Sequence, residues 1–263
     1  MGAKGEKMIL RDQYITSLAS KGERMDKRKV DEFRKIDIEL SPIANAEGSA
    51  RVKMGKTDVI AGVKMGIGEP FPDKQDQGVL MTGAELSPLA SPDFESGPPR
   101  EDAIELARVV DRGIRESGMI DTKKLCIKKG EKVWMVSVDI QIINHDGNLI
   151  DCASLAAVAA LLNAKMPKLD GDRVEFGTKT SKSLPVTCKP AAVTLSKIGD
   201  NLLVDTNVEE EKTAGVRLTV TTKDNGNICA LQKSGSETLT AEEVEKAFEL
   251  SINKGKELRK LLK

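Results

Sequence analysis

The segment at residues 151–165, DCASLAAVAALLNAK, predicts a helix that is apolar or small on nearly every side. A surface helix needs only one apolar stripe, whereas a helix that is apolar all round must be covered on several sides. Its longest apolar run, residues 155–162, is far shorter than the roughly 20 residues that span a bilayer. We therefore expect this helix to be buried between layers of a globular protein, and we expect no membrane span.

The residues that precede this helix alternate between apolar and polar types. Residues 34–68 show a period of two on either side of the turn GKT at residues 55–57, which predicts antiparallel strands joined by a hairpin. The letters GKT also occur in phosphate-binding loops, but such a loop needs a glycine five residues before its GK glycine, and that position is Ala50. We therefore interpret residues 55–57 as a hairpin turn.

The N-terminal part of the chain predicts one helix and one connector. Leu10, Tyr14 and Leu18 lie four residues apart, which predicts an amphipathic helix at about residues 8–21. The mixed basic and acidic residues at 21–35 predict a solvated, self-neutralising link.

The rest of the chain follows the order of strands and then a helix, twice. Strands are predicted at residues 79–89, in a hairpin at 124–147 that turns at 129–130, and at 185–196, 201–205, 215–222 and 227–234, with a tight turn at 224–227. A link with Pro and Gly at residues 166–185 separates the two halves, and the last helix begins with a capping box formed by Thr240 and Glu243. We expect an α+β fold with two similar β-rich halves, residues 1–170 and 171–263.

Composition limits the classes of function. The 263 residues include 41 Lys and Arg against 41 Asp and Glu, so net charge cannot steer a nucleic acid over long range. A single histidine and four cysteines without a CxxC pair exclude a zinc site of the usual spacing and predict reduced thiols; no cofactor is expected. The first residues carry charges without an apolar stretch or cleavage site, so we expect no signal peptide and a cytoplasmic protein.

A predicted helix that begins at Arg100 is the main candidate for nucleic-acid binding. At about 100° per residue, Arg108, Arg112 and Arg115 fall on one side. The opposite side is small or apolar: Ala103, Leu106, Ala107, Val110, Gly113, Ile114 and Ser117. Arginine binds phosphate oxygens through two hydrogen bonds, so this stripe suits an RNA or DNA backbone.

The same stripe has a second interpretation. Helical spacing also permits three ion pairs, Glu105–Arg108, Asp111–Arg115 and Arg112–Glu116. If all three pairs form, the arginines are part of a solvated surface and bind nothing. Spacing alone does not decide between the two interpretations.

The turn DGNLIDCAS at residues 146–154 connects a predicted strand to the apolar helix. Backbone N–H groups at such a helix start attract anions, so this turn has the form of a binding site. The positions that would hold an anion are Leu149 and Ile150, which carry no charge.

Other titratable residues are weaker candidates. Asp200 and Asp205 flank a short apolar run and could act as paired carboxylates, although Asp200 is also typical of a turn. His145 has no serine or cysteine in a recognisable relation to it, so a nucleophilic triad is not expected. Residues 209–211, three glutamates, predict a solvated loop.

Several stretches in order resemble the RNase PH family over nearly the whole chain. They are RMDKRKVDEFRKIDIEL, AEGSARVKMGKTDVIAGVKMGI, REDAIELARVVDRGIRESGMID and SVDIQIINHDGNLIDCASLAAVAALLNA. Within the family, DRGIRESGMID, HDGNLIDCASLAA and IGDNLLVDTNVEEE resemble the non-catalytic subunit of the archaeal exosome ring. The resemblance implies two β-rich halves with helices packed between them.

The resemblance also implies an assembly. This subunit is expected to alternate with a catalytic RNase PH-like paralogue in a hetero-hexameric ring of three heterodimers. RNA-binding cap subunits are expected on top, and single-stranded RNA is degraded from its 3′ end with inorganic phosphate. The arginine stripe falls where ring subunits of this family face RNA, so Arg108, Arg112 and Arg115, and more weakly Arg100, are the expected RNA contacts.

Active members of the family carry a phosphate-holding arginine in the turn after Asp-Gly. In this chain, Gly147 is followed by Asn148, Leu149 and Ile150, so the turn is a degenerate phosphate site. The resemblance places Asp200 and Asp205 near the family's acidic pair, with a spacing one residue shorter. We therefore expect a non-catalytic, RNA-contacting ring subunit. The alternatives are an active phosphorolytic exoribonuclease that uses Asp200 and Asp205, and an inert ring scaffold.

Overall fold

The structure, a computed structural model, describes residues 3–171 and 173–262. Met1 and Gly2, which open the stretch where no signal peptide is expected, lie outside the described residues. So do Asp172, in the predicted link, and Lys263.

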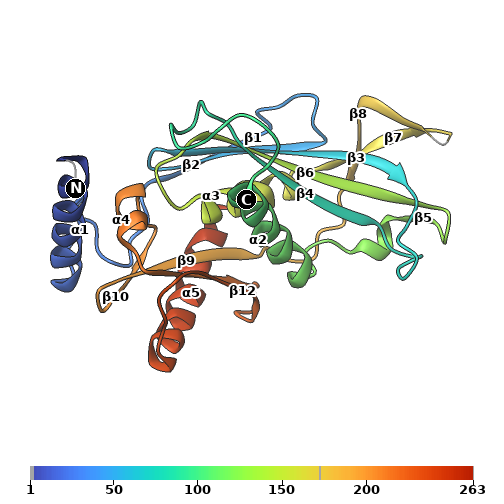
Figure 1. Cartoon of the computed structure of the whole chain (residues 1–263). Coiled ribbons are helices and arrows are strands. Elements are labelled where there is room, and N and C mark those ends of the chain that lie inside the picture. The colour runs from blue at the N-terminus through green and yellow to red at the C-terminus, as the bar shows by residue number, and fades with distance from the viewer. Residues whose placement is uncertain (1–2, 172, 263) are drawn as a thin grey trace.

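Six strands form the larger sheet, in the upper part of Figure 1. They are β1 Ile36–Leu40, β2 Gly48–Met54, β3 Thr57–Gly68, β4 Val79–Leu86, β5 Cys126–Lys128 and β6 Lys132–Asn144. The order is β1-β2-β3-β6-β4, with β5 also paired to β6, and every pair is antiparallel except β4 with β6. The predicted strands around residues 55–57 and the hairpin turn at 129–130 are confirmed. Strand β4 ends at Leu86, three residues before the predicted end.

Four antiparallel strands form the smaller sheet. They are β9 Ala191–Ile198, β10 Asn201–Val204, β11 Val216–Thr222 and β12 Ile228–Gly235, in the order β10-β9-β11-β12. The tight turn at residues 224–227 is confirmed, because β11 pairs with β12 across it. The strand predicted at 185–196 begins only at Ala191. Two prolines, at 185 and 190, interrupt the earlier part and cannot donate to a sheet.

The predicted link at residues 166–185 is mostly a β-hairpin, which corrects the sequence interpretation. Strand β7, Lys165–Asp170, pairs with β8, Arg173–Ser183, and the hairpin projects away from the smaller sheet in Figure 1. The polar side chains and glycines that suggested a linker belong to a two-stranded ribbon.

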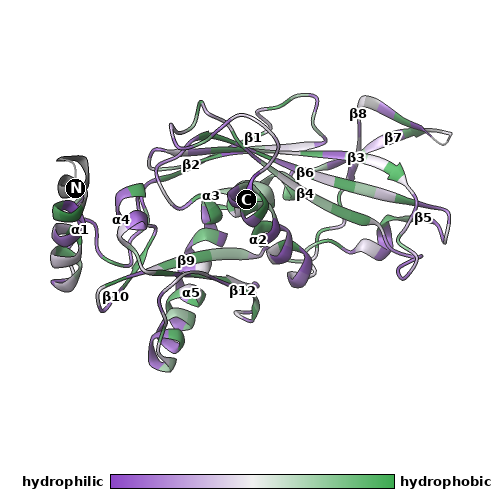
Figure 2. Ribbon diagram, in the orientation of Figure 1, coloured by the Kyte–Doolittle hydropathy of each residue, from purple (hydrophilic) through white to green (hydrophobic). Residues whose placement is uncertain are grey.

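Helices α2, Glu101–Ser117, and α3, Leu149–Leu162, lie between the two sheets (Figure 1). Helix α5, Ala241–Leu261, covers the other face of the smaller sheet. The side chains of successive residues in β11 point to opposite faces of the smaller sheet. Thr221 lies beside Gly113 of α2, and Thr222 lies beside Gly255 of α5. In Figure 2, α2 and α5 each carry both hydrophilic and hydrophobic residues, as helices with one buried face do.

The burial predicted for the apolar helix is confirmed. All residues from Asp151 to Leu161 are buried in α3, and the helix contacts β2 and β3 on one side and β9 on the other. Small residues permit this close packing: a Cβ on Gly48 of β2 would lie 2.3 Å from the carbonyl oxygen of Ala160. A side chain at residue 48 would force the sheet and α3 apart.

The N-terminal helix α1, Ala3–Ser20, is longer than predicted and buries a different face. Leu10 and Tyr14, expected on the apolar face, are exposed. Ile15 and Ala19 pack instead against Ile198 and Leu203 of the smaller sheet. The predicted capping box is confirmed, because Thr240 and Glu243 exchange backbone and side-chain hydrogen bonds at the start of α5. No described helix has the length and apolar character needed to cross a membrane.

Candidate functional site

The arginine stripe lies on the exposed side of α2. Every residue that the sequence placed on the apolar side of this helix is buried, so the register of the two faces is as predicted. Arg108, Arg112 and Arg115 are all exposed. The core therefore fixes the direction in which the three guanidinium groups project.

The structure forms only one of the three ion pairs that helical spacing permits. Arg115 makes two hydrogen bonds of 2.9 Å to Asp111 and one of 3.0 Å to the carbonyl oxygen of Leu80. Arg108 and Arg112, in contrast, have no hydrogen-bond or ion-pair partner among residues 3–171 and 173–262. Arg108 and Arg112 are thus available to an external anion, whereas Arg115 is already engaged.

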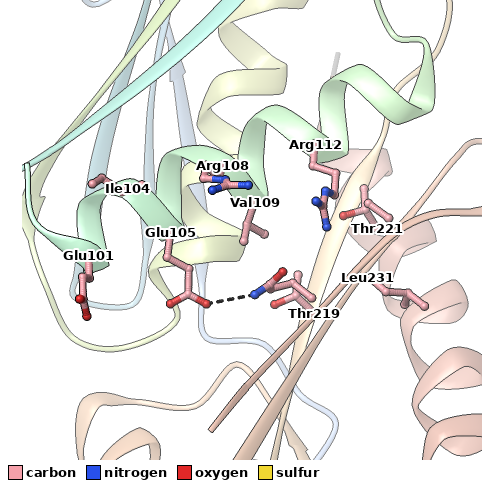
Figure 3. A pocket seen from close by; sticks show the side chains of 11 residues that line it. Glu101, Ile104, Glu105, Arg108, Val109, Arg112, Thr219, Thr221 and Leu231 are labelled. Carbon is pink, nitrogen blue, oxygen red and sulfur yellow. Dashed lines mark hydrogen bonds between the residues drawn. The ribbon is translucent and has the colours of Figure 1, made fainter.

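Glu105, the expected partner of Arg108, points elsewhere. Its carboxylate accepts hydrogen bonds from Ser234 at 2.5 Å and from Gln232 at 3.4 Å, both on β12. Figure 3 shows Glu105 turned toward the strand and Arg112 extending toward Thr221. The acid that spacing assigned to Arg108 is therefore held by the smaller sheet.

Arg108 and Arg112 line a cavity of about 330 Å³ between α2 and the strands β11 and β12 (Figure 3). Its walls combine these cations with apolar side chains such as Ile104, Val109 and Leu231. The same two arginines, with Arg115, border a second groove of about 220 Å³. Arg100, the weaker candidate, is 72% exposed and pairs with Glu95 at 2.5 Å.

The first two residues of the degenerate turn at residues 147–149 are buried. Gly147 has φ +82°, and a Cβ there would lie 2.4 Å from the carbonyl oxygen of Thr206, so only glycine fits. The Thr57 hydroxyl donates to the carbonyl of Gly147 at 2.7 Å. Asn148 also has a positive φ, +52°, and is the N-cap residue of α3. The turn keeps two successive residues with positive φ, although it carries no cationic side chain to bind an anion.

Asp205 joins this turn to the N-terminal connector. It is fully buried, and it accepts hydrogen bonds from Arg34 Nη2 at 2.7 Å, Arg28 Nη1 at 3.1 Å and Asn148 Nδ2 at 2.9 Å. Burial acts to raise the pKa of Asp205, but the bonds and charge of Arg34 and the bond from Asn148 outweigh burial and hold that pKa below its ordinary value. Asp205 is an ionised structural anchor.

The connector at residues 21–35 is not the solvated link that the sequence predicts. Arg24 is buried and makes a two-bond ion pair with buried Glu210, at 2.9 and 2.5 Å. Arg28 and Arg34 reach Asp205 as described above. Residues 209–211 are likewise no solvated loop but part of helix α4, Val208–Thr213. One ion pair, Arg24 with Glu210, joins the two segments across the fold, and sequence spacing could not reveal it.

The two acids that were candidates for paired catalysis do not share a site. Asp200 lies exposed in the turn between β9 and β10, whereas Asp205 is buried at the opposite end of β10, Asn201–Val204. A strand rises about 3.3 Å per residue, so the two carboxylates point to separate regions. The interpretation of Asp200 and Asp205 as a carboxylate pair is therefore wrong.

Glu211, for which the sequence predicts no functional role, faces the start of α3. Its Oε1 accepts a hydrogen bond of 2.7 Å from the backbone N–H of Asn148 and lies 3.5 Å from Nη1 of Arg217. Burial raises the pKa of Glu211, while Arg217 and the Asn148 amide oppose that rise. Glu211, Arg217, Leu149 and Ile150 all line a cavity of about 420 Å³.

His145 and the cysteines give no sign of nucleophilic chemistry. The His145 ring stacks on Phe94 with centroids 5.3 Å apart, and burial lowers the pKa of His145. Cys152 is buried and its pKa is raised by burial, which disfavours a reactive thiolate. Among the described residues, no group of three or more His, Cys, Asp or Glu side chains could hold a metal ion.

Asp151 predicts a pH dependence of stability. Burial raises its pKa to about 7, against hydrogen bonds from Thr194 and Asn148 that lower it. The folded-state pKa of Asp151 is above its unfolded-state value, so the folded protein is stabilised when this carboxyl is protonated. That stabilisation is complete below the unfolded-state pKa and is lost as pH rises through about 7. We expect the free energy of unfolding to fall by about 1.4 kcal/mol between about pH 6 and about pH 8 from this group. Denaturant titrations at these pH values should show the loss in the natural chain and a smaller loss in Asp151→Asn; equal slopes would contradict the assignment.

The fold and this strand-turn-helix site, with an arginine-bearing helix beside it, define a protein with the RNase PH architecture. Residues 32–167 match domain 1 of the 3′ exoribonuclease family and residues 188–254 match domain 2. The chain belongs to this RNase PH family of 3′ exoribonucleases.

Relatives with known names and structures support the assignment to this family. The chain is 52% identical to the exosome complex component Rrp42 of Methanocella arvoryzae, over 97% of this chain and 95% of that protein. It is 49% identical to Rrp42 of Archaeoglobus fulgidus, over 97% and 96% of the two chains. A chain in the structure of the A. fulgidus exosome with RNA bound to the active site has a TM-score of 0.90 and 46% identity, with 97% and 99% covered. A chain of an archaeal exosome core has a TM-score of 0.87 and 42% identity, with both chains fully covered.

Proposed function

We propose that this chain is a non-catalytic ring subunit of an archaeal exosome, a phosphate-dependent 3′-to-5′ RNA-degrading complex in the cytoplasm. The proposal rests on relatives named exosome components over nearly their full length and on the likeness to exosome chains. In this proposal the chain forms a hetero-hexameric ring of three heterodimers with a catalytic RNase PH-like paralogue. RNA-binding cap subunits complete the complex.

The observation that best supports an RNA-contacting role is the difference among the arginines of α2. Arg108 and Arg112 project beside a cavity without partners among the described residues, whereas Arg115 is paired with Asp111. Two unpaired guanidinium groups one helical turn apart suit successive phosphate oxygens of a single strand. The inert-scaffold alternative requires all the arginines to be ion-paired, and these two are not.

A non-catalytic role is supported by the cavity at the start of α3. Phosphate is a doubly charged nucleophile near neutral pH and needs fixed cationic donors in position. Leu149 supplies none, and a missing charge-assisted bond corresponds to about 2 to 3 kcal/mol. The enzyme alternative required Asp200 and Asp205 to work together, but Asp205 is bound to Arg34 and Asp200 lies in a distant exposed turn.

One reconstitution experiment tests the proposal. The chain is purified alone and together with its catalytic paralogue, and phosphate-dependent release of nucleoside diphosphate from unstructured RNA is measured. We expect no release from the chain alone and release from the mixture. Phosphate-dependent release by the isolated chain would refute the non-catalytic role. Failure of the two chains to assemble would refute the ring.

A further inference from the structure

Arg108 and Arg112 of α2 stand between two grooves of different character. On one side, the groove of about 220 Å³ is bordered mostly by polar and charged side chains: Thr82, Asp111, Arg115 and Glu116, with Ala107. On the other side, the cavity of about 330 Å³ has apolar walls: Ile104, Val109, Ala230 and Leu231. Single-stranded nucleic acid also presents charged phosphates on one side and the flat apolar faces of its bases on the other. The two sides of this pair of arginines therefore match the two sides of an RNA strand.

Two apolar side chains on opposite elements of the larger cavity are open to solvent. Ile104 of α2 is 48% exposed and Leu231 of β12 is 43% exposed, and both border the same space (Figure 3). A single exposed apolar residue is ordinary, but two that flank one cavity favour a ligand with an apolar surface. Ligand pockets span roughly 300 to 1,000 Å³, so a cavity of about 330 Å³ suits one small group. A nucleobase is such a group.

Hydrogen-bond acceptors line the part of the cavity nearer the start of α2. Glu105 accepts hydrogen bonds from Ser234 and Gln232 through Oε1 only, so its Oε2 receives none from the part of the chain that the structure describes. The Nε2 of Gln232 donates at 3.4 Å to Glu105 and at 3.5 Å to the Lys233 carbonyl, both long for such bonds, and its Oε1 has no donor among the same residues. Glu101 adds a second carboxylate. This end disfavours a phosphate and favours an amino group.

We propose that the cavity between α2 and β12 is a subsite for one nucleobase of single-stranded RNA, and that it selects bases that carry an amino group. Arg108 and Arg112 hold the phosphates, the apolar walls cover the faces of the base, and Glu105 and Gln232 accept hydrogen bonds from its amino group. Uracil presents a carbonyl oxygen where cytosine presents an amino group. That oxygen would face acceptors and lack a hydrogen bond, so uracil is disfavoured. The inference rests on the proposed RNA contact by the two arginines and adds a base preference to it.

The test compares oligocytidylate with oligouridylate of equal length, bound to the assembled ring without phosphate so that neither strand is degraded. The ratio of the two association constants is measured for the ring with the natural chain and for the ring with Gln232→Leu. We expect this ratio to fall about fivefold in the variant, because leucine keeps the volume but accepts no hydrogen bond. The matched control is Gln13→Leu, which replaces an exposed glutamine on α1 and should leave the ratio unchanged. If Gln232→Leu does not fold, Gln232→Met takes its place.

A second substitution, Leu231→Asn, tests the apolar wall. It should weaken the binding of both strands about threefold or more and leave the salt dependence unchanged, because no phosphate contact is lost.

The outcomes separate this inference from the proposed RNA contact. If replacing Arg108 and Arg112 weakens binding but Gln232→Leu leaves the ratio unchanged, the base subsite is wrong and the RNA contact stands. If replacing the two arginines leaves affinity unchanged, both are wrong. A ring that no longer assembles with Leu231→Asn would also overturn the subsite, since the cavity would then hold a side chain of a neighbouring subunit.

Discussion

Replacing Arg108 and Arg112 together with methionine is expected to weaken RNA binding by the assembled ring about 100-fold, because each lost charge-assisted hydrogen bond corresponds to about 1.5 kcal/mol or more. Methionine keeps much of the apolar stem, so the packing of α2 is preserved. The dependence of affinity on salt should also become weaker, by about 0.7 in the logarithmic slope for each lost phosphate contact with a single strand. Filter binding or fluorescence anisotropy across a salt series measures both effects.

The matched control for this prediction is Arg115→Met. Arg115 lies on the same stripe but is engaged by Asp111 and by the Leu80 carbonyl, so its loss should change RNA affinity by a few-fold at most. Equal effects of the control and the double variant would show that the ion pair does not distinguish these arginines. Unchanged affinity in the double variant would favour an inert scaffold.

Replacing Asp205 with asparagine is expected to lower the free energy of unfolding by about 3 to 5 kcal/mol, the usual penalty for leaving a buried charge without its partner. Arg34 would lose its main counter-ion, and Arg28 would lose one of its two. Asparagine has nearly the same shape and tolerates the positive φ of +51° at this residue. The loss would therefore report the charge and not backbone strain.

Chemical denaturation monitored by circular dichroism measures this effect. The control is Asp200→Asn, a substitution of the same chemistry at the exposed turn before β10, which should change stability by less than about 0.5 kcal/mol. If the two variants lose equal stability, the network around Asp205 is not what joins the N-terminal connector to the smaller sheet.

Local patterns in the sequence were enough to place the main secondary structure of the site. The two faces of α2 follow from the spacing of its small and apolar residues, and every predicted core position is buried. The composition of residues 151–165 likewise predicted the buried helix α3. Both features depend only on periodicity within one element, which is why the sequence could predict them.

Contacts between distant segments could not be predicted in the same way. Arg24 pairs with Glu210, which is 186 residues away along the chain. Glu211 accepts a hydrogen bond from the backbone N–H of Asn148, which is 63 residues away. Helical spacing predicted the ion pairs Glu105–Arg108 and Arg112–Glu116. Glu105 instead accepts a hydrogen bond from Ser234 of β12. The glutamates at 209–211 were assigned to solvent because charged runs usually are exposed. Nothing in the local spacing of charges indicated that Glu210 would pair with Arg24 of the connector.

We propose that this chain holds RNA but performs no phosphorolysis. The most direct measurement uses a ring assembled from the natural chain and a paralogue whose catalytic acid has been removed, with RNA binding and nucleoside diphosphate release followed in the same samples. We expect RNA affinity close to that of the active ring and no nucleoside diphosphate above the level seen without phosphate. Phosphate-dependent release from this ring would contradict the proposal, because this chain would be the only RNase PH-like subunit left in the ring with an unaltered sequence.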